Sequence, residues 1–329
     1  MPDSRQGRWL VEDGIGEQRA LLVDGDTVLA AKVTWPGDLP VGGIVSGRLV
    51  SKAAGAKRGT VQLDNGTEVL VDRIPGDVTE GSMVQLRITR AALAERGRFK
   101  RAQGRIAGRI AGKGDPIPAV EADAFKAGEI VRRFPAGMWE EVWDAMATGD
   151  MAFAGGSLLF SVTPAMTVVD IDGTLPPRDL ALAAVPALAR ALQLFGLGGS
   201  IAIDFPTIDS RADRKAVDNA LESALADWPH ERTAMNGFGL VHIVARLEGP
   251  SLLHRMAVSR VGAAARMALR KAEMVEGPGL TLLTVHPALK AKIRPDWIAE
   301  LERRTGRALR IETDRGLAIE AAQAQIVVQ

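Results

Sequence analysis

Short hydrophobic runs alternate with polar turns along most of the chain. Two of these runs, residues 167–173 and 198–205, are bounded by glycine, and each holds an aspartate near its end, Asp170 and Asp204. Such runs are typical of strands buried in a sheet. The alanine- and leucine-rich stretch 177–195 between them predicts a helix. A strand, a helix and a strand in this order predict a βαβ unit with parallel strands.

Parallel strands would bring Asp170 and Asp204 to the same, C-terminal, edge of the sheet, where open α/β sheets place their sites. An ionised carboxylate at the end of an apolar strand is costly unless it is paired or binds a metal. Two converging carboxylates suit a hard cation such as Mg²⁺, with Mn²⁺ as a substitute. The alternative is that each aspartate caps a turn or pairs with an arginine.

The same patterning divides the remaining chain. Asp24-Gly25 between alternating runs predicts a hairpin, and several short strands with regular turns after residue 41 predict a small β-barrel. The predicted domains are an N-terminal hairpin (1–40), the barrel (41–102), a basic linker with a reduced helical region (103–150), the α/β domain (151–250) and a small C-terminal domain (251–329). In the reduced helical region, Trp139 and Trp143 share one helix face, which favours core packing over a nucleobase clamp.

Composition excludes several classes of site. The 329 residues include no cysteine, so disulfides, thiolate zinc sites and cysteine nucleophiles are excluded. The first residues contain no apolar signal core, and no segment is long and apolar enough to cross a membrane. We therefore expect a cytoplasmic protein with no membrane partner. The net charge is +1, so any affinity for a polyanion must be local.

A local basic stretch does occur between residues 87 and 113, where Glu95 is the single acidic residue. Phe99 lies within it. The alternative to phosphate binding is a solvated basic face, but the position of the stretch between the barrel and the α/β domain favours RNA contact. The candidate RNA-binding residues here are Arg96, Arg98, Lys100, Arg101, Arg105 and Arg109.

A second basic group opens the helix predicted after Asp204. Arg211, Arg214 and Lys215 lie in its first turn, where positive charge opposes the helix dipole. Contact with RNA phosphates is one reason for these charges. Pairing with Asp209 or Asp213 is the other.

Four motifs follow one another over residues 167–246: VVDIDGT, GGSIAIDF, RKAVDNALESAL and NGFGLVHIVAR. Their order and spacing resemble the catalytic core of the ribonuclease E/G family. The resemblance implies an OB-type RNA-binding barrel, an RNase E-type, DNase I-like catalytic α/β domain and a small C-terminal α/β domain. It also implies that Asp170 and Asp204 hold a catalytic Mg²⁺. The family asparagine corresponds to Asp172, which becomes a third candidate ligand.

The chain also departs from the family pattern. It would be a compact member without the Cys-x-x-Cys zinc link, the 5′ sensor and most of the RNase H-like subdomain. The barrel aromatics of the family correspond roughly to Gln62 and Val69, and the family arginine before Phe-Gly is Gly237. The family glutamate is His242, which suits acid–base chemistry but, as a lone histidine in an apolar strand, is more often structural.

The function expected from these features is a Mg²⁺-dependent endoribonuclease. Asp170 and Asp204 would be catalytic, and single-stranded RNA would be hydrolysed to 5′-phosphate and 3′-hydroxyl ends. One alternative is an RNA-binding relative with weak or no catalysis, and another is a nuclease for a different phosphodiester. A homo-oligomer through the small domain, without zinc, is compatible with the sequence.

Overall fold

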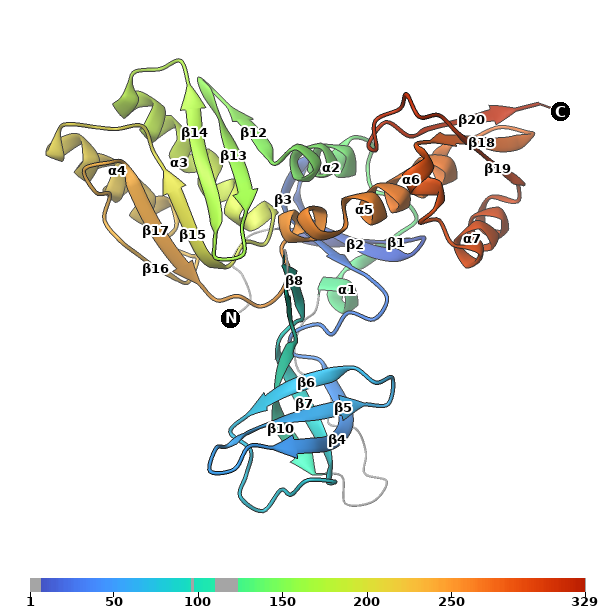
Figure 1. Ribbon diagram of the computed structural model, residues 1–329. Helices are drawn as coiled ribbons and strands as arrows, with labels where there is room; N and C mark the ends of the chain where they lie inside the picture. The colour runs from blue at the N-terminus through green and yellow to red at the C-terminus, as the bar shows by residue number, and fades with distance from the viewer. Residues whose placement is uncertain (1–6, 96–97, 110–123, 329) are drawn as a thin grey trace.

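The protein has a three-armed shape in a computed structural model, which describes residues 7–95, 98–109 and 124–328 (Figure 1). One arm holds the sheet that carries both aspartates. A second arm holds the C-terminal strands and helices, and the third is the barrel. An N-terminal sheet and the helix α2 (Met138–Thr148) lie where the arms meet.

The N-terminal sheet has the strand order β11-β1-β2-β3. Its strands are β1 (Arg8–Gly14), β2 (Glu17–Asp24), β3 (Thr27–Thr34) and β11 (Glu129–Val131), and the short helix α1 (Ala124–Ala127) precedes β11. The predicted hairpin at Asp24-Gly25 is confirmed, because Asp24 pairs with Thr27 across it. Trp139 and Trp143 of α2 are both buried in the main core, which confirms the core prediction for them.

The barrel is closed, with the strand order β10-β6-β5-β4-β7. Its strands are β4 (Ile44–Lys52), β5 (Arg58–Leu63), β6 (Glu68–Asp72), β7 (Met83–Arg90) and β10 (Ala102–Arg109). The barrel has a hydrophobic core of its own, separate from the main one. Its closing strand begins at residue 102, where the predicted barrel ended, so residues 103–109 are a strand and not a linker.

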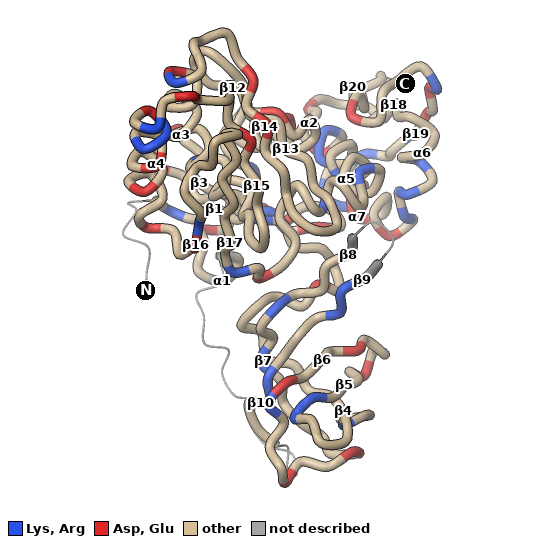
Figure 2. Tube along the Cα trace, turned by 60° about the vertical axis from the view of Figure 1, so that its left-hand side comes forward, with Lys and Arg blue, Asp and Glu red and all other residues tan. Residues whose placement is uncertain are grey.

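A short hairpin, β8 (Leu93–Glu95) and β9 (Arg98–Lys100), lies between the barrel and the rest of the molecule (Figure 1). Leu93 is buried, and the Ala91 N–H donates to the Glu248 carbonyl. The basic stretch therefore runs through the barrel wall and its attachment point, and Figure 2 shows Lys and Arg positions along β7 and β10.

The sheet domain has six strands in the order β12-β13-β14-β15-β17-β16. These are β12 (Asp150–Phe153), β13 (Gly156–Val162), β14 (Thr167–Gly173), β15 (Gly199–Asp204), β16 (His230–Arg232) and β17 (Leu240–Ala245). The helix α3 (Pro177–Leu194) connects β14 to β15, and these two strands pair in parallel. The predicted βαβ unit is thus confirmed.

The two faces of this sheet differ. Val169, Ile171 and Ile203 lie on the face that α3 and α4 (Arg211–Ala224) cover, and they are buried. The side chains that alternate with them point to the opposite face, where Asp170, Asp172 and Asp204 are exposed. The sheet domain therefore presents one open face, and the aspartates lie on it.

The C-terminal arm follows the long helix α5 (Leu252–Met274), which is kinked at Ser259. Its sheet has the order β19-β18-β20, formed by β18 (Leu280–Val285), β19 (Leu309–Thr313) and β20 (Gln323–Val327). The helices α6 (Pro287–Lys290) and α7 (Pro295–Thr305) connect β18 to β19. Among the described residues, no helix is long and apolar enough to span a membrane.

Candidate functional site

Asp170 and Asp204 are register partners on the adjacent parallel strands β14 and β15. Residues opposite one another on neighbouring strands project from the same face, and neighbouring strands lie about 4.8 Å apart. Both side chains are exposed. The sequence therefore predicted correctly that the two aspartates are neighbours on adjacent strands, but Asp170 lies in the middle of β14 and not at its end.

Neither carboxylate has a hydrogen-bond or ion-pair partner among the residues that the structure describes, and the same holds for Asp172. Among these residues, no contact of the aspartates therefore supports the alternative roles, which were a turn cap or an ion pair with an arginine. Two unpaired carboxylates within one strand spacing repel each other. A divalent cation between them would relieve that repulsion, so the donor set fits Mg²⁺ or Mn²⁺.

Asp172 lies two residues after Asp170 and so on the same open face, opposite Ser157 of β13. Over the described ranges, no group of three or more His, Cys, Asp or Glu side chains is arranged to hold a metal ion. Asp170 and Asp204 alone would supply two protein ligands, a number that Mg²⁺ commonly accepts when water and phosphate supply the others. The third ligand remains a prediction.

The helices α3 and α4 both begin at this edge, and an ion pair joins their first turns. Arg178 Nε lies 3.0 Å from Asp213 Oδ1. Arg214 donates to the carbonyls of Ile208 and Asp209, so it holds the loop that leads out of β15. The alternative of pairing with Asp209 or Asp213 is not met among the described residues, because Asp213 pairs with Arg178 and Arg214 binds the backbone carbonyl of Asp209, not its carboxylate.

Arg211 and Lys215 differ from Arg214. Both are exposed, and neither has a partner within the described part of the chain. They are therefore available to an anion beside the first turns of α4, which begins after the loop that follows β15. Helix N-termini add the partial positive charge of their unpaired N–H groups at the same place.

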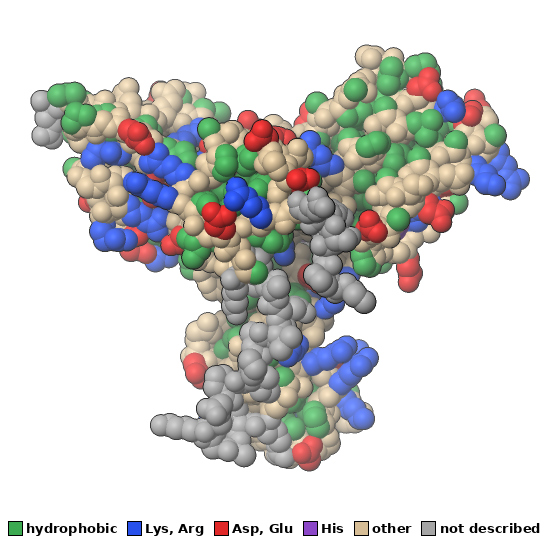
Figure 3. Space-filling view, turned by 180° about the vertical axis from the view of Figure 1, so that it is seen from behind, with side chains coloured by type: hydrophobic (Ala, Val, Ile, Leu, Met, Phe, Trp, Pro, Cys, Tyr) green, Lys and Arg blue, Asp and Glu red, His purple; other side chains and the backbone are tan. Residues whose placement is uncertain are grey.

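The predicted RNA-binding residues of the barrel are partly neutralised. Arg101 lies 2.9 Å from Glu68, and Arg105 lies 3.5 Å from Asp72, both across the β6–β10 pair. Lys100 also has an interaction partner. For Arg98 and Arg109 the structure describes the backbone in β9 and β10, and Arg96 lies outside the described residues. Seen from behind, the barrel still presents a group of Lys and Arg side chains (Figure 3).

The barrel has no aromatic ring at the two positions compared above. Gln62 is exposed on β5, whereas Val69 is fully buried in the barrel core.

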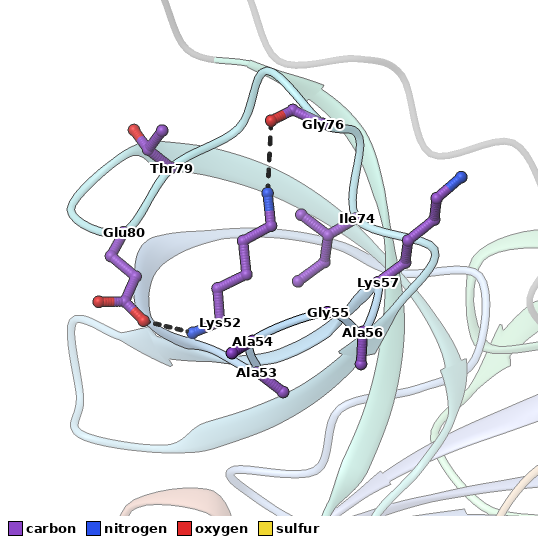
Figure 4. Close-up of a pocket in the computed structure, with 10 residues that line it drawn as sticks. All are labelled: Lys52, Ala53, Ala54, Gly55, Ala56, Lys57, Ile74, Gly76, Thr79 and Glu80. Atoms are coloured by element: carbon purple, nitrogen blue, oxygen red, sulfur yellow. Dashed lines mark hydrogen bonds between the residues drawn. The ribbon is translucent and has the colours of Figure 1, made fainter.

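A hollow of about 570 Å³ lies beside these strands, between the loops after β4 and β6 (Figure 4). Lys52 Nζ points into it but donates to three backbone carbonyls, those of Pro75, Gly76 and Val78. Its ammonium is thus occupied in holding the loop.

His242 lies on the open face, opposite Ala202 of β15. Its Nε2 is 2.7 Å from Ser200 Oγ. Ser200 lies four residues before Asp204 on the same strand, so this bond turns the ring away from the aspartate pair. The contact supports the structural alternative for His242.

A shallow groove of about 790 Å³ runs along α4 to β16. Trp228 and His230 stack in it with their ring centroids 5.3 Å apart. Lys215 lines one part, but Asp218 and Glu222 line it too, and Asp218 pairs with Arg232 at 3.0 Å. The groove therefore carries charges of both signs.

Phe238 is a feature that the sequence analysis did not single out. It precedes β17 in a turn, and its ring is 83% exposed, more than any other large hydrophobic side chain among the described residues. The signal was present, because Asn236-Gly237 is a common turn sequence.

Comparison with known proteins agrees with these features. Residues 138–246 match the model of the Ribonuclease E/G family. The chain is 35% identical over 113 residues to Ribonuclease G of Escherichia coli K12 and, at the same identity and length, to that of Salmonella typhimurium SL1344. The match covers 31% of this chain and 23% of each of these relatives. The resemblance to the ribonuclease E/G family is thereby confirmed over residues 138–246.

Proposed function

We propose that the protein is an endoribonuclease of the ribonuclease E/G type that hydrolyses single-stranded RNA with the help of Mg²⁺. The observation that carries this proposal is the pairing of Asp170 with Asp204 on adjacent parallel strands of an open sheet face. The family match over residues 138–246 includes both aspartates. The chain spans less than a quarter of the relatives that it matches, so its activity is inferred from the site.

Asp170 and Asp204 would hold the cation from the sheet side and leave its other positions toward solvent. Mg²⁺ bound there would lower the pKa of a bound water and stabilise charge on the scissile phosphate. Arg211 and Lys215 would bind phosphates of the same strand at the edge of the sheet. Cleavage would leave 5′-phosphate and 3′-hydroxyl ends, as the family resemblance implies.

The closed five-stranded barrel supports an OB-type RNA-binding role. Its group of Lys and Arg side chains would bind the RNA backbone, and salt would weaken this binding. Because Arg101 and Arg105 already pair with carboxylates, their contribution would be smaller than that of unpaired cations. The barrel would hold the strand while the sheet domain cleaves it.

The test is cleavage of a labelled single-stranded RNA in Mg²⁺ by the wild type and by Asp204→Asn. We expect the substitution to lower the rate by about 100-fold or more, because it removes one of two charged ligands. Asp227→Asn is the matched control, since Asp227 is an exposed carboxylate just beyond the far end of α4. Equal cleavage by Asp204→Asn and the wild type would refute the proposal.

The alternative of a non-catalytic RNA-binding relative has one observation in its favour. Gly237 stands where the family has an arginine, and among the described residues no atom beyond its chain neighbours lies within 4 Å of the position its Cβ would take. Binding of RNA in EDTA, with no cleavage in Mg²⁺ over hours, would support that alternative.

A further inference from the structure

The turn before β17 has a hydrogen-bonded backbone and carries an aromatic side chain, that of Phe238, in solvent. Asn236 Oδ1 accepts hydrogen bonds from the N–H groups of Phe238 and Leu240, at 2.9 and 3.0 Å. The Asn236 N–H donates to the Leu240 carbonyl, and the Gly239 N–H donates to the Asn236 carbonyl. Four hydrogen bonds thus fix a turn of five residues, and none of them buries the ring of Phe238.

This turn is also fastened to the strand that carries Asp204. The Phe205 N–H donates to the Gly239 carbonyl at 3.2 Å, and Leu240 is the register partner of Asp204. Gly239 has a φ of +88°, and a Cβ there would lie 2.3 Å from the Phe205 carbonyl oxygen. The close approach therefore requires glycine, and it sets Phe238 two residues from the partner of Asp204.

Further apolar side chains flank the carboxylates. Leu159 and Leu240 lie in the same cross-strand row as the aspartates, so the order across the sheet is Leu159, Asp170, Asp204, Leu240. Both leucines are exposed. Exposed apolar side chains gathered in one place indicate a binding surface more than scattered ones do.

We propose that Phe238 is a stacking platform for an unpaired base of the RNA strand, next to the scissile phosphate. This inference rests on the function proposed above and adds a base-binding subsite to it. Leu240 would contact the same nucleotide from the sheet side, between Phe238 and Asp204. The sheet domain would thereby supply an aromatic contact that Gln62 and Val69 of the barrel do not provide.

Charge decides between RNA and a protein as the occupant. A protein that covered this apolar surface would bury Asp170, Asp172 and Asp204, which have no partner among the described residues, at a cost of several kcal/mol for each unpaired charge. An RNA strand brings its phosphates to Arg211 and Lys215 and places one of them opposite the carboxylates, where a cation can lie between. Stacking tolerates any base, so Phe238 would give affinity without sequence preference.

The first measurement is the affinity of the full-length protein for a fluorescein-labelled ten-nucleotide single-stranded RNA, by anisotropy in EDTA. Because stacking contributes about 1–3 kcal/mol per base, Phe238→Ala should weaken binding by about 5- to 150-fold. Phe238→Trp keeps a ring and should stay within about twofold of the wild type. Ile130→Ala, at a 79% exposed residue of β11, is the control and should leave the affinity unchanged.

A strand of the same length without bases separates stacking from other effects. If Phe238 stacks on a base, the wild type and Phe238→Ala should bind this abasic strand equally. Equal affinities of the two proteins for the normal strand would overturn the proposal. So would a change of oligomeric state in Phe238→Ala, measured by light scattering, without a change in RNA affinity, because the ring would then contact a second copy of the chain.

Cleavage assays tell this inference apart from the proposed function. If the wild type cleaves RNA and Phe238→Ala binds and cleaves equally well, the stacking role alone is wrong. If the wild type binds but does not cleave, the catalytic proposal is wrong, and the affinity of Phe238→Ala still decides the stacking role. If the wild type neither binds nor cleaves, both are wrong.

Discussion

Arg270 of α5 and Glu12 of β1, which are 258 positions apart in the chain, form a buried ion pair with 2.9 Å between Nε and Oε1. Arg19 of β2 donates to the same oxygen, and the Phe134 N–H donates to Oε2 at 3.0 Å. One carboxylate thus joins the N-terminal sheet, the segment before α2 and the helix that leads into the C-terminal arm.

Removal of Arg270 should destabilise the protein strongly. In Arg270→Met, Glu12 keeps Arg19 but loses one of its two buried cations, and breaking a buried pair costs about 3–5 kcal/mol. Urea denaturation would measure the loss. Arg8→Gln is the control, because the Arg8–Glu129 pair is exposed and should contribute no more than about 1 kcal/mol. Equal losses in the two variants would contradict the assigned role of the buried pair.

The same site predicts a pH dependence. Burial alone would raise the pKa of Glu12, but the hydrogen bond from Arg270 and the charges of Arg19 and Arg270 outweigh it and lower this pKa. A lowered pKa in the folded state stabilises the protein above the unfolded value of about 4.5 and ceases to do so as the pH falls through the folded value. The stability difference between the wild type and Glu12→Gln should therefore be largest above about pH 5 and shrink below about pH 4.5.

Urea titrations of the two proteins between pH 3 and 7 would check this dependence. A difference that stays constant over that range would show that Glu12 does not titrate with a lowered pKa. Other carboxylates with a lowered pKa are the same in both proteins and cancel, such as Glu300, whose hydrogen bonds from Arg303 and Arg304 lower its pKa to about 2.

The sequence predicted the elements that local pattern determines. The glycine-bounded runs around Asp170 and Asp204 are β14 and β15, and the alanine-rich stretch between them is α3. The βαβ rule then gave their parallel pairing. Local pattern was sufficient here because each strand is buried on one face and its period of two is clear.

What depends on distant pairing was not predictable. Residues 101–109 are mostly small or basic and resemble a linker. In the folded protein, β10 closes the barrel, and Arg101 and Arg105 pair with Glu68 and Asp72. The contact of Glu12 with Arg270 depends on how α5 packs against the N-terminal sheet. None of these is a property of a short window of sequence.

Arg211 and Lys215 of α4, which have no partner among the described residues, should bind RNA phosphates. The double variant Arg211→Ala and Lys215→Ala should raise KM for a single-stranded RNA and leave kcat nearly unchanged, because it removes binding that the substrate and the transition state share. A plot of log K for RNA binding against log salt concentration has a slope that each phosphate contact makes steeper by about 0.7 for a single strand. The loss of two contacts should therefore make this slope shallower by about 1.4.

The control for the cations is Lys292→Ala with Arg315→Ala, which removes two exposed charges from the C-terminal arm. It carries the same change in net charge away from the sheet domain. If this control lowers the salt slope as much as the α4 variant does, RNA binding follows overall charge and not the site.

The central claim is that Asp170 and Asp204 together hold a divalent cation. The most direct measurement is the anomalous difference density of crystals soaked in Mn²⁺. The account predicts one peak on the open face of the sheet domain, with a carboxylate oxygen of each aspartate at about 2.0–2.2 Å, and no peak there in crystals of Asp204→Asn. A peak bound to one of the two aspartates only, or a Mn²⁺ ion held elsewhere while these carboxylates stay empty, would contradict it.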